Sequence, residues 1–501
     1  MKSHPHRSVP QEIELKLCLP GADPADLAKR LARTPLLARR KPLRQSLYNI
    51  YFDTPQQHLR QQGVALRLRR VGNPNDPQWL QTLKTSTQTL SALSQRGEWE
   101  TTVAEPALSL AALQRTPWPG IDPDGRLFAE LVPSFVTRFE RTLWLVRRRD
   151  GSVVEVALDI GRIDADGKRT PICELELELK AGEPAALFEL ARQLAGSVAV
   201  LPASLSKAER GYLLAQDALG QPQRARTPKL GFPLSRTELA QSLLREMFAQ
   251  FTCNLDVLRT SDDPEVVHQA RVGWRRFRSV LRLFKKSLAM TAMPAWGGLH
   301  ALLSGLGELR NLDVALNETL PTLSSGYVMA DDERAQAWQA MIAALTQSAG
   351  LQRQTVRQAM QQPGVGLCLL ALTEWLESLN ATDSGEPVKQ GRLRQWARHQ
   401  MVRLQHRLED AHQQVATLPE QHRVRILAKR LRYGVEALRD LLPKSLATAY
   451  AEQATQLQTG LGFSRDVAMV GALLAGRHHD PAIEAYLRGV VAGSRLQPQP
   501  S

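Results

Sequence analysis

The chain has 501 residues, more than a single hydrophobic core usually serves, so we expect two or more domains. Lysine and arginine total 64 against 50 aspartates and glutamates, and the formal charge of +14 indicates a polyanionic partner such as nucleic acid, a phosphate polymer or an anionic surface. No apolar run is long enough to cross a membrane and no signal-peptide pattern opens the chain, so we predict a cytoplasmic protein with no membrane partner. The four cysteines are widely spaced without a Cys-x-x-Cys pair, which argues against disulfides and structural zinc.

The first predicted strand carries Glu12, Glu14 and Lys16 on one face and apolar residues on the other, because side chains alternate along a strand. A helix is expected over residues 24–33. Further strands are expected over residues 46–52, 64–70, 78–85, 96–100, 135–146 and 153–163, with turns at 73–77 and 164–167.

The last predicted strand, residues 174–180, alternates charge and leucine without interruption: Glu174, Glu176, Glu178 and Lys180 share one face. For one such strand alone, a solvated charged face over a leucine core is the ordinary explanation. Two strands of this kind place carboxylates beside carboxylates, which repel. A bound divalent cation would remove that cost.

Taken together, the strands predict a polar face crowded with acids and bases. Its members are Glu12, Glu14, Lys16, Arg67, Arg69, Lys84, Arg96, Glu98, Glu100, Arg141, Glu155, Asp159, Glu174, Glu176, Glu178 and Lys180. A closed barrel can turn such a face toward a polar interior. Cations hold phosphate oxygens while carboxylates hold Mg²⁺ or Mn²⁺, so the mixture indicates polyphosphate chemistry.

These residues resemble the CYTH superfamily of triphosphate tunnel metalloenzymes. The resemblance rests on Glu12, Glu14 and Lys16, on residues 51–54 (Tyr-Phe-Asp-Thr), 66–69 (Leu-Arg-Leu-Arg), Lys84, 96–100, Asp159 with Gly161, the strand at 174–180, and 206–212. The resemblance covers roughly the first 215 residues, and this region is similar to bacterial inorganic triphosphatases. The resemblance implies an eight-stranded antiparallel tunnel that hydrolyses a triphosphate with divalent metal.

The resemblance also implies roles for individual residues. The metal ligands would be Glu12, Glu14, Asp159, Glu174 and Glu176. The phosphate-binding residues would be Lys16, Arg67, Arg69, Lys84, Arg96, Arg138, Arg141, Lys180, Lys207 and Arg210. Arg67, Arg69 and Lys84 would also act in catalysis, and Glu178 or the carboxylate nearest the metal-bound water would orient that water. Glu98, Glu100 and Arg138 have an alternative role as internal ion pairs of a crowded lumen.

The second half of the chain is predicted to be helical. Residues 219–233 lack apolar periodicity and are predicted to be a linker, which places a tunnel domain at 1–218, a helical domain at 234–494 and a flexible tail at 495–501. A long helix is expected to begin after Asp263, with Pro264 in its first turn.

Two basic stripes recur 154 residues apart in this half. His268, Arg271, Arg275 and Arg278 have the same offsets of three, four and three as His422, Arg425, Lys429 and Arg432. Each stripe lies on one helix face, and the repetition indicates an internal duplication that brings both stripes to one anion.

The stripes resemble CHAD domains, helical modules implicated in binding inorganic polyphosphate. The resemblance implies these binding residues: His268, Arg271, Arg275, Arg276, Arg278, Arg310, His422, Arg425, Lys429, Arg430, Arg432 and Arg465. The expected fold is therefore α+β and multidomain, with an antiparallel β tunnel followed by an all-α bundle.

Two functions remain open from the sequence. The chain is either a metal-dependent hydrolase of inorganic triphosphate or a non-catalytic polyphosphate-binding or targeting protein. Thiamine triphosphate and nucleoside triphosphates are alternative substrates of the hydrolase. Nucleic acid is an alternative partner of the helical half, and the oligomeric state is left open.

Overall fold

The computed structural model describes residues 11–21, 23–73, 76–85, 91–226, 228, 230–231, 234–289, 292–382, 388–414, 417–460, 463–475 and 480–496. The chain divides into two compact units. The first comprises Met1–Gln221, Pro294–Gly298 and Met360–Glu377, and the second comprises Pro222–Met293, Leu299–Ala359 and Ser378–Ser501. Residues 360–377 therefore group with the first unit although they lie inside the predicted helical domain.

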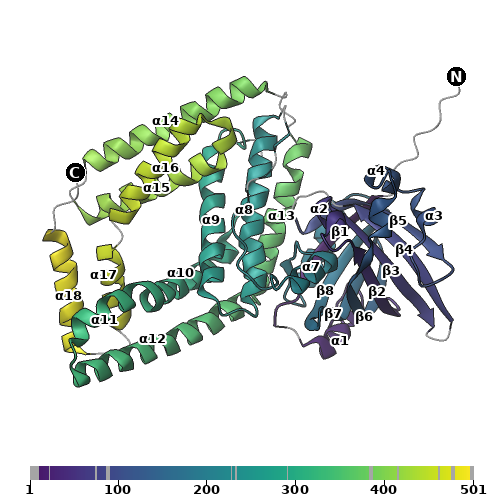
Figure 1. Cartoon of the computed structure of the whole chain (residues 1–501), viewed down its shortest axis with the longest axis horizontal. Coiled ribbons are helices and arrows are strands. Elements are labelled where there is room, and N and C mark those ends of the chain that lie inside the picture. Colours follow the sequence, from purple (N-terminus) through teal and green to yellow (C-terminus); the bar gives the residue numbers. More distant parts are fainter. Residues whose placement is uncertain are drawn as a thin grey trace. The chain divides into compact units, whose positions relative to one another are not determined.

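The first unit is built on antiparallel strands (Figure 1). They are β1 (Gln11–Cys18), β2 (Leu43–Asp53), β3 (Val64–Asn73), β4 (Asp76–Thr85), β5 (Leu93–Val103), β6 (Val132–Arg147), β7 (Val153–Ala165), β8 (Lys168–Ala181) and the two-residue β9 (Leu201–Pro202). The order is β5-β4-β3-β2-β6-β7-β8-β1-β9, and a further pairing of β5 with β1 closes the sheet. The predicted eight-stranded antiparallel barrel is confirmed, with β9 as a short addition on β1. Residues 74 and 75, in the centre of one predicted turn, lie outside the described residues.

Helices cover part of the barrel and leave the charged faces inward. The helices of this unit are α1 (Pro24–Ala32), α2 (His58–Gln61), α3 (Leu110–Leu113), α4 (Trp118–Ile121), α5 (Arg126–Ala129), α6 (Ala185–Ala195) and α7 (Lys207–Ala215), and most of α13 (Pro363–Thr382) joins them. Leu15 and Leu17 of β1 and Leu175 and Leu177 of β8 form a buried apolar cluster with α1, α6 and Leu370 of α13. Because side chains alternate, burying these leucines outside the barrel turns the intervening glutamates and lysine into the lumen.

Helix α7 packs against β6, β7 and β8. Its Ser206 cap accepts a hydrogen bond from the Glu209 N–H at 3.1 Å. A Cβ atom at Gly211 would lie 2.3 Å from the Phe135 ring, so only glycine allows this close approach. The sequence between Ser206 and Tyr212 therefore fixes where α7 begins and how closely it meets the barrel.

The second unit is helical. Its elements are α8 (Arg236–Leu258), α9 (Pro264–Leu283), α10 (His300–Val314), the π-helical turn η2 (Ala315–Thr319), α11 (Leu320–Val328), α12 (Asp332–Ala359), α14 (Gln390–Gln413), α15 (Leu418–Ala437), η3 (Arg439–Leu441), α16 (Lys444–Gly460), α17 (Phe463–Leu474) and α18 (Pro481–Leu496), with the end of α13; the 3₁₀ turn η1 (Gly297–Leu299) lies at the unit boundary. Ser235 and Glu238 form a capping box on α8, and Asp263 caps α9 with Pro264 in its first turn. The predicted helix start at Pro264 is confirmed.

Corresponding helices of the two predicted copies touch: α9 packs against α15, and α10 against α17. These contacts are the ones that the predicted duplication requires. No helix within the described ranges is both long and apolar enough to span a membrane.

Candidate functional site

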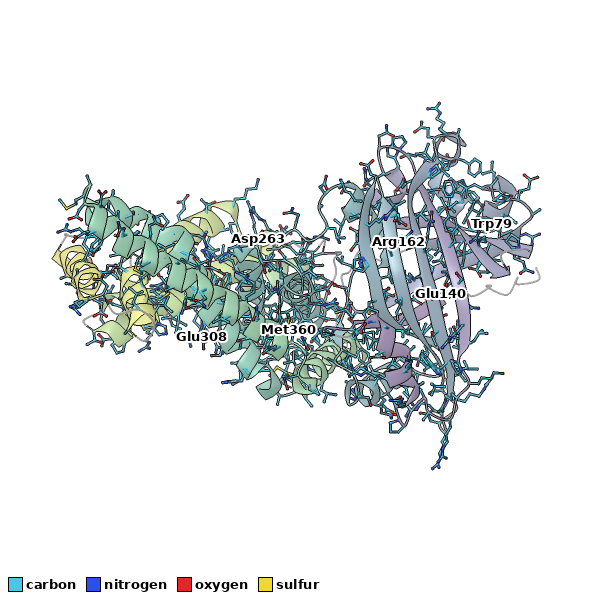
Figure 2. The ribbon with its side chains drawn as sticks, turned by 90° about the horizontal axis from the view of Figure 1, so that it is seen from below. Trp79, Glu140, Arg162, Asp263, Glu308 and Met360 are labelled. Carbon is cyan, nitrogen blue, oxygen red and sulfur yellow. The ribbon has the colours of Figure 1, made fainter. Side chains whose placement is uncertain are left out.

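The strand register brings the predicted charged residues to one lumen. Lys16 of β1 lies directly opposite Glu176 of β8, and Glu14 lies opposite Glu178. On the other side of β8, Asp159 of β7 lies opposite Glu174. By contrast, Glu140 on β6 and Arg162 on β7 are exposed and belong to the outer surface of the barrel (Figure 2).

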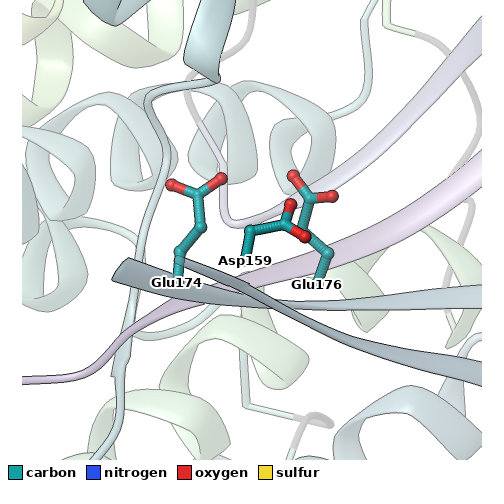
Figure 3. A group of neighbouring side chains, drawn as sticks. All are labelled: Asp159, Glu174 and Glu176. Carbon is teal, nitrogen blue, oxygen red and sulfur yellow. The ribbon is translucent and has the colours of Figure 1, made fainter. Parts of the chain in front are cut away.

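Three of the predicted metal ligands form a compact carboxylate triad, which we define as Asp159, Glu174 and Glu176 (Figure 3). Each offers a carboxylate oxygen, and the three oxygens lie within 4.8 Å of one another. The ammonium of Lys207 lies 2.6 Å from Asp159, 2.6 Å from Glu174 and 2.7 Å from Glu176. Arg141 also contacts Asp159 at 2.7 Å and Glu176 at 2.5 Å. The triad thus surrounds one positive group and borders another.

The other two predicted ligands, Glu12 and Glu14, lie beside a second set of cations. Arg96 contacts both carboxylates at 2.6 Å, and Lys84 contacts Glu12 at 2.9 Å. Burial alone would raise the pKa of Glu12, but Lys84 and Arg96 outweigh it and the pKa is lowered. The pKa of Glu14 is instead raised, by burial and by the charge of Glu176. Glu14 is therefore the carboxylate of this pair that lacks sufficient positive charge.

The residues present fit a divalent cation. Oxygen ligands in a group of three carboxylates are what Mg²⁺ and Mn²⁺ prefer. The ammonium of Lys207 already shows that the triad holds a positive charge at its centre. In addition, Glu14 Oε1 is buried without a hydrogen bond, with only the Lys16 ammonium 3.1 Å away. The lumen therefore has carboxylate oxygens whose charge a metal would satisfy.

Arg67 and Arg69 on β3 are the lumen cations most available to an anion. Arg69 donates to Asn49 Oδ1 at 2.8 Å and has no carboxylate within ion-pair distance among the described residues. Burial and the neighbouring Arg67 and Arg141 lower the pKa of Arg69 to about 10. Arg67 reaches Glu98 only at 3.5 Å, and its buried Nε has no hydrogen-bond partner among the described residues. Two buried guanidinium groups thus retain unused donors.

Tyr51 is a lumen residue that the sequence analysis named only within a motif. It lies opposite Arg67 in the register, and its ring stacks on Phe135 with centroids 4.6 Å apart. Burial would raise the pKa of its phenol, yet Arg67, Arg69 and Lys207 outweigh burial and lower it. Its position two residues before the end of β2, within the motif at residues 51–54, was the available signal.

Arg138 was predicted to bind phosphate, but the structure places it outside the lumen. Its side chain is 54% exposed, lies 3.8 Å from Asp164 and stacks over the Tyr48 ring. Arg138 and Arg141 are three residues apart on one strand, so they point to opposite faces, and Arg141 is the one in the lumen. The position of Arg138 therefore gives no support to its predicted role in phosphate binding.

Glu178 and Lys180 lie apart from the carboxylate triad. Lys180 is 39% exposed and contacts Glu178 at 2.5 Å and Glu155 at 3.5 Å. Burial raises the pKa of Glu178. Arg210 does reach the triad, at 3.1 Å from Glu174.

Two further acids of the predicted polar face, Glu98 and Glu100, have partners on β4. Lys84 contacts Glu98 at 3.0 Å, and the Thr82 hydroxyl donates to Glu100 at 3.0 Å. Glu98 thus forms an internal ion pair, whereas the contact of Glu100 with Thr82 is a hydrogen bond to a neutral group.

In the helical unit, cations from both predicted copies interact in one basic cluster, which we define as Arg271, Arg275, Arg310, Arg425, Lys429 and Arg465. Burial, together with Arg275, Arg310 and Arg465, lowers the pKa of Arg271 to about 10. Burial, together with Arg275, Arg425 and Arg465, lowers the pKa of Lys429 to about 8. The cluster thus joins α9 and α10 of the first copy to α15 and α17 of the second.

Gly307 on α10 leaves room for the side chain of Arg271 in the basic cluster. A Cβ atom at Gly307 on α10 would lie 2.8 Å from Arg271 Nη1. Arg310 is partly neutralised by Glu318 of the π-helical turn, at 2.7 Å.

The remaining predicted polyphosphate-binding residues separate into several environments. Arg276 follows Arg275 directly but points into the helix packing, where its buried guanidinium contacts Glu436 at 2.9 Å and Gln250 at 2.7 Å. This position gives no support to its predicted role in ligand binding. Arg278 and Arg430 interact with Arg282 and Arg407, which the sequence analysis did not single out. His268 lies beside Arg310 and Arg275, and burial with these charges lowers its pKa. Arg432 stacks over Tyr433, and His422 is exposed.

Comparison with known proteins supports both domain assignments. A family model for the CYTH domain matches residues 10–212, and one for the CHAD domain matches residues 242–475. Over 205 residues the chain is 36% identical to an inorganic triphosphatase of Haemophilus influenzae. The match covers 41% of this chain and 55% of that protein, so the chain spans about half the length of this relative.

Two solved structures are also similar. The CHAD domain from Ricinus communis has 27% identity and a TM-score of 0.46, covering 55% of this chain and 91% of that one. A putative adenylyl cyclase from Hippeastrum, described as having a dominant triphosphatase activity, has 19% identity and a TM-score of 0.31, covering 42% of this chain and 97% of that one. Together with the closed barrel, the family matches identify a CYTH domain at residues 10–212 and a CHAD domain at residues 242–475.

Proposed function

We propose that the barrel hydrolyses inorganic triphosphate to diphosphate and phosphate with Mg²⁺ or Mn²⁺. The observation that carries this proposal is that the carboxylate triad shares a lumen with Arg69, which has no carboxylate partner among the described residues, and with Arg67, whose Nε has no hydrogen-bond partner among them. A site that only binds a polyanion gains nothing from five carboxylates among its cations. The 36% identity to an inorganic triphosphatase agrees with hydrolysis of a triphosphate.

Each group of lumen residues has a different role in this proposal. The triad, with Glu14, would hold the metal, which when bound polarises phosphate oxygens and lowers the pKa of water. Arg67 and Arg69 bind the non-bridging oxygens of the chain of phosphates through charge-assisted hydrogen bonds. Lys84 and Arg96 contact Glu12 and Glu14, and Arg141 contacts Asp159, so these cations balance the negative charge of the lumen. Because these groups are fixed by packed strands, they cost no reorganisation when charge develops in the transition state.

Inorganic triphosphate is preferred over thiamine triphosphate and nucleoside triphosphates as substrate. Three aromatic rings near the lumen already have partners: Tyr51 and Phe135 stack on each other, and the Lys207 ammonium lies 5.0 Å from the centroid of the Phe139 ring. None of these rings is left to stack on a base or a thiazole.

We propose a second function for the helical unit, the binding of inorganic polyphosphate by the basic cluster. Arg271, Arg275 and Lys429 have no carboxylate within ion-pair distance among the described residues, although each lies among other cations. A polyanion that spans both copies would relieve this repulsion. Duplex nucleic acid is the competing ligand, and competition at equal salt separates the two.

The hydrolase proposal is tested by phosphate release from inorganic triphosphate with Mg²⁺, Mn²⁺ or a chelator. ATP, thiamine triphosphate and long-chain polyphosphate are the other substrates. Wild type should release phosphate from triphosphate only with metal, and Glu12→Gln with Glu176→Gln should abolish release. The matched control is Glu140→Gln, because this glutamate is on the outer surface. Absence of release from every substrate, with polyphosphate still bound, would instead favour the non-catalytic binding protein.

A further inference from the structure

Asp53, at the end of β2, is a buried carboxylate that no part of the proposed reaction uses. It is fully buried and has no cation within ion-pair distance among the described residues. Its oxygens accept hydrogen bonds from the N–H groups of Thr54, Leu59 and Arg60 at 2.8, 2.9 and 3.0 Å and from the Tyr212 hydroxyl at 2.9 Å. A buried charge is retained only where such bonds satisfy it. Asp53 therefore joins the start of α2 to Tyr212 of α7.

A second contact joins the same two helices. Arg60 of α2 donates from Nε and Nη2 to Glu209 of α7, at 3.2 and 2.6 Å. The guanidinium of Arg60 also lies 5.1 Å from the centroid of the Tyr212 ring. We call Asp53, Arg60, Glu209 and Tyr212 the α7 latch.

The latch determines where Lys207 lies. Glu209 and Tyr212 are three residues apart and share one side of α7, and Lys207 occupies the first turn of the same short helix. Lys207 is 7% exposed, and its ammonium contacts all three carboxylates of the triad. A divalent cation bound by the same oxygens would need the space and the charge that this ammonium now supplies.

We propose that Lys207 is an internal cation that occupies the carboxylate triad until a divalent metal displaces it, and that Asp53 and Tyr212 are positioning residues that set how strongly it competes. This inference rests on the proposed function, because it assigns the triad to metal. Displacement leaves the Lys207 ammonium in the lumen, where it is available to a phosphate oxygen. Arrival of the metal thus releases a cation for the substrate, and the triad is never left as three unbalanced carboxylates.

The test is the affinity of the full-length chain for Mn²⁺ without triphosphate, measured from free Mn²⁺ by electron paramagnetic resonance. Tyr212→Phe keeps the ring and removes only the hydrogen bond to Asp53, worth about 1 kcal/mol, so it should tighten Mn²⁺ binding by roughly fivefold. Lys207→Gln should tighten it further. Tyr48→Phe is the matched control, because Tyr48 lies on the same strand as Asp53 but packs against Arg70 and Arg138, and it should leave the affinity unchanged.

The direction of the change in Mn²⁺ affinity separates a positioning role from damage to the fold. A variant whose triad is merely disordered would bind Mn²⁺ more weakly, so weaker or unchanged binding in both Tyr212→Phe and Lys207→Gln overturns the proposal. Tyr212→Phe should also raise KM for triphosphate while changing kcat little, because Lys207 is placed less well for phosphate.

Failure of this inference can be told apart from failure of the proposed function. If wild type binds Mn²⁺ but releases no phosphate, the hydrolase proposal is wrong and the Mn²⁺ comparison still decides the role of Lys207. If wild type hydrolyses triphosphate while Tyr212→Phe does not bind Mn²⁺ more tightly, only the role of the latch is overturned.

Discussion

The barrel lumen and the basic cluster of the helical unit both gather cations, but they neutralise them differently. In the lumen, Lys16, Lys84, Arg96, Arg141 and Lys207 each contact at least one carboxylate. In the basic cluster, Arg271, Arg275 and Lys429 face mainly other cations. Carboxylates placed among phosphate-binding cations weaken anion binding. The many acid–base pairs of the lumen therefore fit the proposed metal chemistry, whereas a cluster in which several cations lack a carboxylate partner among the described residues fits the proposed anion binding.

The largest effect is expected from removing a metal ligand of the triad. Glu174→Gln should lower kcat for triphosphate by about 10²–10³-fold, because a positioned charge at the reacting centre is lost. It should also weaken Mn²⁺ binding. Initial rates and an Mn²⁺ binding isotherm measure both effects, with Glu140→Gln as the exposed control. A variant that retains wild-type turnover would remove the triad from the reaction.

A smaller loss is expected at Arg69, a lumen cation that has no carboxylate partner among the described residues. Arg69→Gln should lower kcat/KM by about 10- to 100-fold, since hydrogen bonds to charged groups are worth about 1.5–3 kcal/mol. Arg69→Lys should recover only part of this, because lysine lacks the planar fork that also donates to Asn49. Steady-state kinetics test this, and full activity in Arg69→Lys would contradict a geometric role.

The affinity of the basic cluster for polyphosphate should depend on pH through Lys429, a residue outside the lumen. The pKa of Lys429 is lowered to about 8, so Lys429 is charged below pH 8 and loses its proton above it. A bound polyphosphate favours the charged form, so affinity should fall as pH rises from 7 to 9. Lys429→Arg, whose charge persists, should flatten this profile. Fluorescence anisotropy with labelled polyphosphate measures it, and an equal decline in Lys429→Arg would exclude Lys429 as the cause.

The smallest effect is expected at Arg138. Arg138→Gln should change kcat/KM for triphosphate less than twofold, since an exposed ion pair contributes at most about 1 kcal/mol and lies outside the lumen. Arg141→Gln on the same strand is the comparison, because Arg141 contacts Asp159 and Glu176. A loss at Arg138 as large as at Arg141 would contradict the assigned faces.

The alternation of charge and leucine was enough to predict the barrel strands and most of the lumen. It identified Glu12, Glu14, Asp159, Glu174 and Glu176 because period-two patterning assigns faces directly. The same rule assigns residues 138 and 141 to opposite faces, and Arg138 entered the predicted phosphate-binding set through the family resemblance instead of the alternation.

Other features depend on distant pairings that no local pattern contains. Asp53 and Tyr212 are 159 residues apart, and their hydrogen bond follows from how α7 packs on the barrel. Arg276 sits within the predicted basic pattern, yet Glu436 and Gln250 bind it because it faces the interior of the helix packing. The grouping of residues 360–377 with the barrel unit is likewise a long-range contact, made by Leu370.

The most direct test of the contrast between the two sites is a crossed comparison of two full-length variants. Glu176→Gln removes a triad carboxylate, and Arg275→Ala with Lys429→Ala removes two cations of the basic cluster. Metal-dependent phosphate release from triphosphate and binding of long-chain polyphosphate in chelator are measured for each. The expected result is that the first variant loses release and keeps binding, while the second keeps release and loses binding. If either variant loses both or neither, the assignment of metal chemistry to the lumen and of anion binding to the basic cluster is contradicted.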